Sequence, residues 1–267
     1  MSNLALRVLT AVVALPLVAA LIAWREPLGF GGLVLVVATL ALVEYTGVTL
    51  PGASRRLRAA VVVIGVGLAA AIYMHPPLAL VWALVALVAV GAAVLFEPGE
   101  IAGAGARLGL AAFGVFYIGL LAAPLAILHR DAPEGPLWVF VALAVTFGND
   151  TGAYFTGRAL GRHKLYPTIS PGKTVEGGVG GMVAGVGMML LGHFTVARTL
   201  SLADCLLVAI PAGIVGPIGD LIESMLKRAS GVKDSGRLLP GHGGMLDRID
   251  ALLFVSAWVY VYALYLR

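Results

Sequence analysis

The sequence predicts an all-α fold, a polytopic integral membrane protein of about nine transmembrane helices. Apolar residues make up 60% of the 267 residues and charged residues only 12%, whereas a soluble domain is roughly half apolar and about a quarter charged. The apolar residues form segments close to the ~20 residues that a helix needs to cross a bilayer. We place these segments at about 5–24, 29–48, 59–74, 77–96, 107–129, 137–157, 177–197, 203–228 and 246–266.

The charge distribution predicts the orientation. In the first segment Arg7 precedes an apolar stretch, as in a signal peptide, but this stretch is longer than a typical signal core, so an uncleaved helix is favoured. With nine spans, 14 of the 18 Lys and Arg residues fall on the side of the N-terminus. The positive-inside rule then predicts a multi-pass protein of the cell (inner) membrane with its N-terminus and active site cytoplasmic and its C-terminus external. Basic loops suit anionic lipid headgroups, and no nucleic-acid partner is expected.

The chain is expected to have two unequal parts. Residues 1–105 form four spans with few charges inside the membrane, among them Glu44. Residues 106–267 form five spans with cytoplasmic loops, carry most of the polar residues and are the predicted catalytic region.

Two spans of the second part have unusual compositions. The seventh contains Gly177, Gly181 and Gly185, a spacing that allows close helix packing; direct ligand contact is the alternative. The eighth contains two prolines and three glycines just before Asp220. We expect this helix to be kinked or broken, with its freed backbone groups facing protein or a wet cavity.

Four carboxylates are predicted to reach the cytoplasmic half of the membrane. Asp247 and Asp250 are three residues apart, so a helix places them on one face. Asp220 lies about 12 Å of helix before the cytoplasmic end of its span, and Asp150 lies at a comparable depth. Such oxygen ligands bind Mg²⁺ in phosphoryl-transfer sites. The predicted metal ligands are Asp220, Asp247 and Asp250; the alternative is that Asp220 pairs with a cation and the others cap helices.

Basic residues surround these acids between Ser224 and Asp250. Lys227, Arg228, Lys233, Arg237 and Arg248 fit a triphosphate, which needs both metal and side-chain cations; the alternative is a lipid-facing basic patch. His242 stands in a glycine-rich turn that allows close approach to a ligand. A lone His is more often a hydrogen-bonding loop residue than a catalytic base.

The loop 158–176 contains Ser170, Lys173 and Thr174. Its Gly-Lys-Thr piece is not a P-loop, because Pro167 stands where that motif needs a glycine. These three residues predict a phosphate-contact loop. The equally weighted alternative is a helix-capping turn into the next span, with Glu176 near the start of the helix.

The sequence resembles the integral-membrane phosphatidate cytidylyltransferases, also called CDP-diglyceride synthases. Their signature S-x-x-K-R-x4-K-D, followed by P-G-H-G-G-x-x-D-R-x-D, is filled without a gap between Ser224 and Asp250. A second similar stretch runs from Asp150 through Tyr154, Gly157 and Gly161 to Ser170, Pro171, Lys173, Thr174, Glu176 and Gly177. Val175 replaces an aromatic residue often found before the Glu.

The resemblance implies the reaction CTP + phosphatidic acid → CDP-diacylglycerol + pyrophosphate, with in-line attack of the lipid phosphate on the α-phosphorus of CTP. It also implies Mg²⁺ dependence, metal binding through Asp220 and Asp247, and a homodimer. The expected catalytic residues are Asp220, Lys227, Arg228, Lys233, Asp247 and Asp250. The expected substrate-binding residues are Asp150, Ser170, Lys173, Thr174, Glu176, Ser224, His242 and Arg248.

Two other functions stay open at this stage. A CTP-dependent polyisoprenol kinase would share features of the nucleotide site but transfer the γ-phosphoryl group. An ion-coupled transporter would use Asp150 and Asp220 as coupling sites and the eighth span as a broken helix. A transporter should keep its key polar groups near the midplane, whereas most of them here fall at one surface. The sequence pattern of the CDP-alcohol phosphotransferases is absent.

Overall fold

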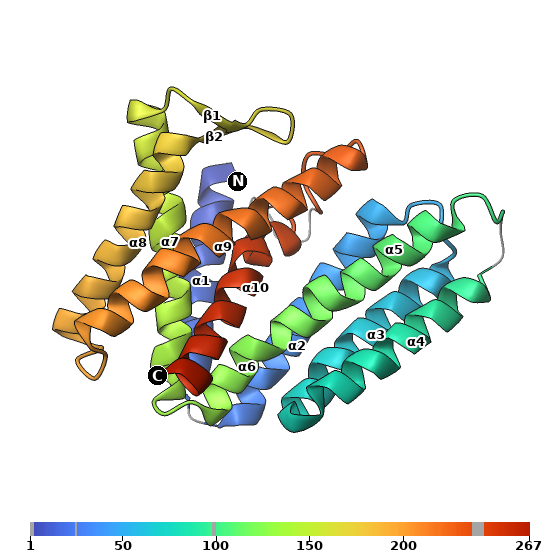
Figure 1. The fold of residues 1–267 in the computed structure, drawn as a ribbon, viewed down its shortest axis with the longest axis horizontal. Coiled ribbons are helices and arrows are strands. Elements are labelled where there is room, and N and C mark those ends of the chain that lie inside the picture. Colours follow the sequence, from blue (N-terminus) through green and yellow to red (C-terminus); the bar gives the residue numbers. More distant parts are fainter. Residues whose placement is uncertain (1–2, 25, 98–99, 237–242) are drawn as a thin grey trace. The chain divides into compact units, whose positions relative to one another are not determined.

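The computed structural model describes the chain except residues 1–2, 25, 98–99 and 237–242, and the side chains of 3–11 and 13. It is helical almost throughout (Figure 1). The helices are α1 Asn3–Ala23, α2 Pro27–Thr49, α3 Arg55–Met74, η1 Pro76–Leu78, α4 Ala79–Leu95, α5 Ala104–Gly114, η2 Val115–Leu120, α6 Leu121–Asp131, α7 Gly135–Leu160, α8 Val175–Thr195, α9 Leu202–Ala229, α10 Leu246–Val261 and η3 Tyr262–Leu266. The strands are β1 Lys164–Tyr166 and β2 Ser170–Thr174.

The predicted all-α membrane fold is confirmed. Among the described residues, seven helices are long and apolar enough to cross a membrane. They are Pro27–Thr49, Arg55–Met74, Pro76–Leu95, Ala104–Asp131, Val175–Thr195, Leu202–Ala229 and Leu246–Leu266. The two other predicted spans are helices as well: α1 has side chains that are only partly described, and α7 carries Asn149 and Asp150 in an otherwise apolar sequence.

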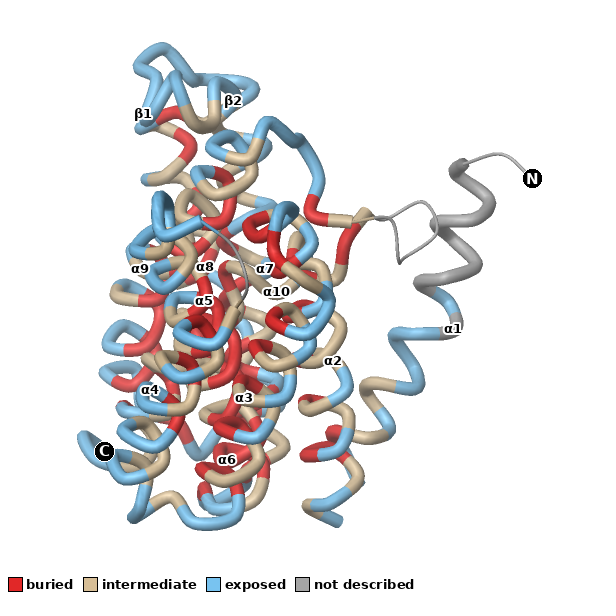
Figure 2. The backbone as a smooth tube through the Cα atoms, turned by 90° about the vertical axis from the view of Figure 1, so that its right-hand side faces the viewer, coloured by how far each residue is buried: buried red, intermediate tan, exposed pale blue. Residues whose placement is uncertain are grey.

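The helices form two compact units, and each is described by itself. The first unit comprises Met1–Ile127 and Ala229–Arg248, and the second Leu128–Arg228 and Ile249–Arg267. Buried and exposed positions alternate along the helices (Figure 2). Many large apolar side chains are exposed, Val63 and Leu80 among them. An apolar outer surface fits a protein surrounded by lipid rather than water.

Glycines allow close helix packing in the first unit. The ring of Tyr45 on α2 lies against Gly114, and its hydroxyl donates to the Leu110 carbonyl at 2.7 Å. A Cβ atom on Gly65 of α3 would come within 2.7 Å of Leu42, and one on Gly119 would collide with the backbone of Gly65. These contacts leave no room for side chains where α2, α3 and the α5–η2 segment meet.

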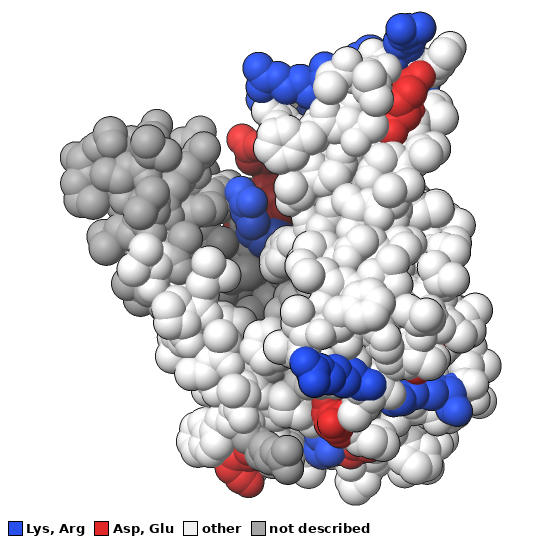
Figure 3. Space-filling view, turned by 90° about the vertical axis from the view of Figure 1, so that its left-hand side faces the viewer, with Lys and Arg blue, Asp and Glu red and all other residues white. Residues whose placement is uncertain are grey.

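In the second unit, α7 and α8 run antiparallel side by side, joined by the β1–β2 hairpin (Figure 1). The predicted packing role of Gly177, Gly181 and Gly185 is confirmed, because all three are buried in α8. A Cβ atom on Gly181 would lie 2.6 Å from Oδ1 of Asn149 on α7. On the face shown in Figure 3, charged side chains form a few separate groups, and most of the surface around them is uncharged.

The eighth span was expected to be kinked or broken, and of these two the break is wrong. Helix α9 is continuous from Leu202 to Ala229, although Pro211 and Pro217 lie inside it. Its glycines serve packing instead: a Cβ atom on Gly219 would lie 2.6 Å from the Asp250 carbonyl oxygen of α10. Close packing against a neighbouring helix stabilises a helix that prolines alone would weaken.

Candidate active site

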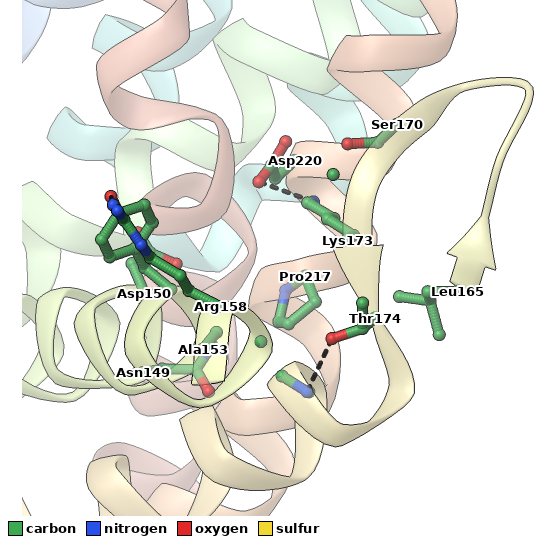
Figure 4. A pocket seen from close by; sticks show the side chains of 15 residues that line it. Asn149, Asp150, Ala153, Arg158, Leu165, Ser170, Lys173, Thr174, Pro217 and Asp220 are labelled. Atoms are coloured by element: carbon green, nitrogen blue, oxygen red, sulfur yellow. Dashed lines mark hydrogen bonds and ion pairs between the residues drawn. The ribbon is translucent and has the colours of Figure 1, made fainter. Parts of the chain in front are cut away.

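A pocket of about 670 Å³ lies in the second unit, between the C-terminal half of α7, the β2 strand and the middle of α9 (Figure 4). Five predicted site residues line it, namely Asp150, Ser170, Lys173, Thr174 and Asp220. They come from three segments that are far apart in the sequence. The structure therefore brings the phosphate-contact loop and two of the predicted carboxylates to one place.

Helix α7 presents a polar face to this pocket. Asp150, Tyr154 and Arg158 follow one another at four-residue spacing, which places them on one side of a helix. Arg158 Nη1 donates to the Tyr154 hydroxyl at 2.9 Å. Arg158 was not among the predicted site residues, although its spacing from Asp150 was a usable signal.

Asn149 is a second lining residue that the sequence analysis missed. It is buried, and its Oδ1 accepts no hydrogen bond from the part of the chain that the structure describes. A buried amide oxygen without a partner costs free energy. Asn149 is a polar residue beside Asp150 in an otherwise apolar span, which was a usable signal, but its place at the pocket wall depends on the packing of α8.

Lys173 and Asp220 form the central contact of the pocket. Lys173 Nζ lies 2.6 Å from Asp220 Oδ2, and Figure 4 shows the lysine of β2 reaching to the aspartate of α9. The two side chains are 25% and 35% exposed, so the pair is accessible from the pocket. The other oxygen, Oδ1, accepts from the Ser224 hydroxyl at 3.3 Å. The alternative in which Asp220 pairs with a cation thus describes this structure.

The β2–α8 junction combines both roles considered for its loop. Thr174 is the N-cap of α8, where its hydroxyl oxygen accepts from the Gly177 N–H at 3.0 Å. Glu176 lies outside the pocket lining, accepts the Arg162 N–H at 3.0 Å and pairs with His163 Nδ1 at 2.6 Å. These bonds hold the hairpin to the helix, and Ser170, Lys173 and Thr174 line the pocket.

Three carboxylates of the second unit influence one another electrostatically. They are Asp150 on α7, Asp220 on α9 and Asp250 on α10. The cations nearby are Lys173, which acts on Asp150 and pairs with Asp220, and Lys227, which acts on Asp250. Neighbouring carboxylates repel one another, and a cation placed among them relieves the repulsion.

The predicted phosphate-binding cations of α9 have partners inside the second unit. Lys227 forms an ion pair with Glu223, one turn earlier on the helix and only 1% exposed. Glu223 is a further residue that the sequence analysis missed. Arg228 Nε donates to the Ile169 carbonyl at 3.3 Å, so it supports the hairpin that carries Ser170.

Three more predicted residues, Lys233, Asp247 and Arg248, belong to the first unit. Lys233 and Arg248 are exposed. Asp247 lies in the first turn of α10, and its Oδ2 accepts the N–H groups of Ser235 at 3.1 Å and Gly244 at 3.0 Å. Arg237 and His242 lie outside the described residues.

The carboxylates near the pocket could hold a metal ion only together with other ligands. Among the residues with described placement, no group of three His, Cys, Asp or Glu side chains could hold a metal ion by itself. Mg²⁺ is usually held by one or two carboxylates together with substrate phosphates and water. The mutually repelling carboxylates of the second unit fit that mode, in which the substrate completes the coordination.

Comparison with known proteins gives the family. The sequence model of the cytidylyltransferase family matches residues 5–266. Three similar proteins are named phosphatidate cytidylyltransferase: those of Brucella suis (46% identical over 154 residues), Staphylococcus saprophyticus (44% over 145 residues) and Bacillus subtilis (39% over 154 residues). The matched regions cover 54–58% of this chain and 56–57% of each relative, so the chain spans little more than half the length of these relatives. Because the family match extends over nearly the whole sequence, the chain belongs to the cytidylyltransferase family.

Proposed function

We propose that this protein is a phosphatidate cytidylyltransferase that converts CTP and phosphatidic acid to CDP-diacylglycerol and pyrophosphate. The observation that carries the proposal is the accessible Lys173–Asp220 pair in a pocket whose lining also includes Asp150 and Ser170. The names of the relatives and the membership of the family support the same activity. A polyisoprenol kinase and a transporter are not favoured, and the continuous α9 lacks the broken helix of the transporter hypothesis.

In the proposed reaction, a phosphate oxygen of phosphatidic acid attacks the α-phosphorus of CTP in line. The new P–O bond forms as the bond between the α-phosphorus and the oxygen bridging to the β-phosphate breaks, and that oxygen leaves with pyrophosphate. A phosphomonoester is largely ionised at neutral pH, so the nucleophile needs no strong base. The work of the protein is then to position two anions and stabilise the charge that develops between them.

Lys173 is the residue that we expect to change partner during the cycle. Without substrate its ammonium group neutralises Asp220. A polyphosphate in the pocket presents a higher density of negative charge, and lysine is a compact charge on a flexible stem. We infer that Lys173 moves to a phosphate when CTP binds, which leaves the Asp220 carboxylate available to a metal ion.

The proposed cofactor is Mg²⁺, held by Asp220, Asp247 and Asp250 together with the substrate. When bound, the ion supplies neutralisation of the charge on the phosphates. The remaining predicted residues are proposed to contact the substrates through their cations, hydroxyl groups or hydrogen-bonding side chains. They are Lys227, Arg228, Lys233, Ser170, Thr174, Ser224, Asp150, Glu176, His242 and Arg248.

The decisive test is the purified protein in detergent with phosphatidic acid, each nucleoside triphosphate in turn, Mg²⁺ and a detector for pyrophosphate. We expect pyrophosphate and a labelled lipid only with CTP. Release of CDP instead of pyrophosphate would identify a kinase, and the absence of turnover with every nucleotide would contradict the proposal.

We further propose an inner-membrane protein, active as a homodimer, with a cytoplasmic N-terminus and active site and an external C-terminus. The second unit supports this orientation. The β1–β2 hairpin and the chain around it carry Arg158, Arg162, Lys164, Lys173, Lys227 and Arg228, whereas the opposite helix ends carry Arg130, Arg198 and Arg267. By the positive-inside rule, the end with more basic residues is cytoplasmic.

The orientation can be tested by labelling engineered cysteines with impermeant reagents. A cysteine at Lys164 should react only in inside-out vesicles, and one placed after Leu266 only in right-side-out vesicles. Reaction of both from the same side would contradict the proposed topology. Cross-linking in the membrane tests the homodimer.

A further inference from the structure

Glu44 of α2 contacts a segment that lies about 200 positions later in the sequence. Its Oε2 accepts the Ser235 hydroxyl at 3.1 Å and the Leu246 N–H at 3.0 Å. All three residues belong to the first unit. One carboxylate oxygen therefore joins α2 to both described ends of the segment 235–246.

The backbone around this carboxylate is shaped to admit it. A Cβ atom on Gly244 would lie 2.6 Å from Glu44 Oε2 and would also collide with the Ser235 hydroxyl. A Cβ atom on Gly236 would collide with Glu44 Oε1. Glycine at both positions lets the chain approach the carboxylate more closely than any other residue would allow.

The groups that bind Glu44 also hold Asp247. Ser235 donates its hydroxyl to Glu44 and its backbone N–H to Asp247 Oδ2 at 3.1 Å. Gly244, which packs against Glu44, donates its N–H to the same Asp247 oxygen at 3.0 Å. Leu246, bound by Glu44, directly precedes Asp247 at the start of α10. The Asp247 carboxylate is thus placed by groups that Glu44 itself places.

Packing alone does not account for a glutamate at this position. Glu44 Oε1 is buried and accepts no hydrogen bond from any residue whose placement is described. An ionised group in such surroundings carries a desolvation cost that an apolar residue would avoid. The two hydrogen bonds to the 235–246 segment are what an apolar residue could not make.

We propose that Glu44 is a positioning residue for the reaction, which orders residues 235–236 and 243–246 and thereby sets the Asp247 carboxylate. The role in the reaction rests on the proposed function, because it assigns Asp247 to the active site. The ordering itself does not depend on that assignment. The inference gives residues 1–105 a part in the chemistry, which the sequence analysis had placed entirely in residues 106–267.

Hydrogen exchange of the full-length protein in detergent tests the ordering without any activity measurement. Glu44→Ala should speed exchange in peptides covering 243–250 by at least about tenfold, because it removes the acceptor of the Leu246 N–H. Glu44→Gln should stay within about threefold of the wild type, because its amide oxygen can accept the same two bonds. The matched control is Glu97→Ala, which removes another glutamate of the first unit that accepts a serine hydroxyl and a backbone N–H, those of Ser54.

The proposal is overturned if Glu44→Ala leaves exchange in 243–250 unchanged, or if Glu97→Ala speeds it equally. Should Glu44→Ala fail to fold, Ser235→Ala removes the hydroxyl donor alone and should speed the same exchange by several-fold; unchanged exchange in that variant also overturns it. These outcomes stand even if the wild type shows no turnover of CTP, a result that would contradict only the proposed function.

Kinetics then test the link to Asp247. Outer residues that orient a metal ligand typically change activity or metal affinity by about 10- to 100-fold when replaced. Glu44→Ala should lower kcat within that range and raise the Mg²⁺ concentration for half-maximal rate, with KM for CTP within about threefold. The double variant Glu44→Ala/Ser235→Ala should lose no more than about twofold beyond Glu44→Ala, since both changes break one network. Fully multiplicative losses, or an unchanged Mg²⁺ requirement, would refute the positioning role.

Discussion

Asp220 in the second unit and Asp247 in the first are held by groups of different kinds. Asp220 meets a lysine ammonium group at 2.6 Å and a serine hydroxyl at 3.3 Å, both at the ends of side chains. Asp247 Oδ2 accepts two backbone N–H groups, which cannot turn away without moving the chain. The contrast suggests a division of work in which Asp220 exchanges partners when substrate binds and Asp247 stays where the backbone holds it.

Neutralising either aspartate gives the largest expected effect. Asp220→Asn and Asp247→Asn should each lower kcat by at least about 100-fold, because each removes the charge of a proposed metal ligand. They should differ in exchange: Asp247→Asn speeds exchange of the Ser235 and Gly244 amides, whereas Asp220→Asn leaves them unchanged. Turnover near the wild-type rate at saturating Mg²⁺ would show that the altered residue is not a metal ligand. Identical exchange patterns in the two variants would contradict the proposed difference in how the two aspartates are held.

Lys173→Met tests the proposed exchange of partners at Asp220. A charge-assisted hydrogen bond contributes about 1.5–3 kcal/mol, which corresponds to a roughly 10- to 150-fold fall in kcat/KM. The change should act mainly through KM for CTP or for the lipid. Kinetics within about twofold of the wild type, with an unchanged Tm, would leave the lysine as a partner of Asp220 alone.

Two helix caps, one in each unit, offer a matched comparison in which the expected effects are smaller. Thr174 caps α8 in the second unit, and Ser54 caps α3 in the first, with acceptor distances of 3.0 Å from Gly177 N and 3.1 Å from Leu57 N. Replacement of each by Ala should destabilise the protein by about 0.5–2 kcal/mol, measured by reversible unfolding in detergent. Only Thr174→Ala should also raise KM for CTP, because only Thr174 lines the pocket. Equal effects on KM would mean that the pocket does not bind the nucleotide.

The smallest expected effect is a pH dependence in the first unit. The backbone N–H and hydroxyl of Ser54 lower the pKa of Glu97 below its usual value of 4.5. A lowered pKa in the folded state adds stability above the usual value, and this stability is lost as the pH falls through the lowered one. The difference in Tm between the wild type and Glu97→Gln should therefore shrink as the pH is lowered below about 4.5. A constant difference would contradict the assigned cause.

Much of the fold was predictable because a bilayer imposes simple rules. All nine predicted segments became helices, since a chain in lipid must satisfy its backbone groups within each segment. The glycines of α8 were correctly assigned to packing from their spacing alone. Helix α9 was the exception, because the effect of Pro211 and Pro217 depends on the neighbours that pack against the helix.

Local chemistry is what the sequence by itself determined: helices of membrane length, the capping Thr174, and a dense group of acids and bases near the end of the chain. Tertiary structure alone decided which of these groups meet. From the sequence, Lys173 could have belonged to a phosphate-contact loop or to a helix-capping turn. The fold placed its Nζ 2.6 Å from Asp220 Oδ2. Glu44 was only an unusual charge in an apolar span, and the fold set it against Ser235 and Leu246. The physical reason is that propensity and hydrophobicity act over a few neighbouring residues, whereas the partner of a buried charge is chosen by the packing of helices far apart in the chain.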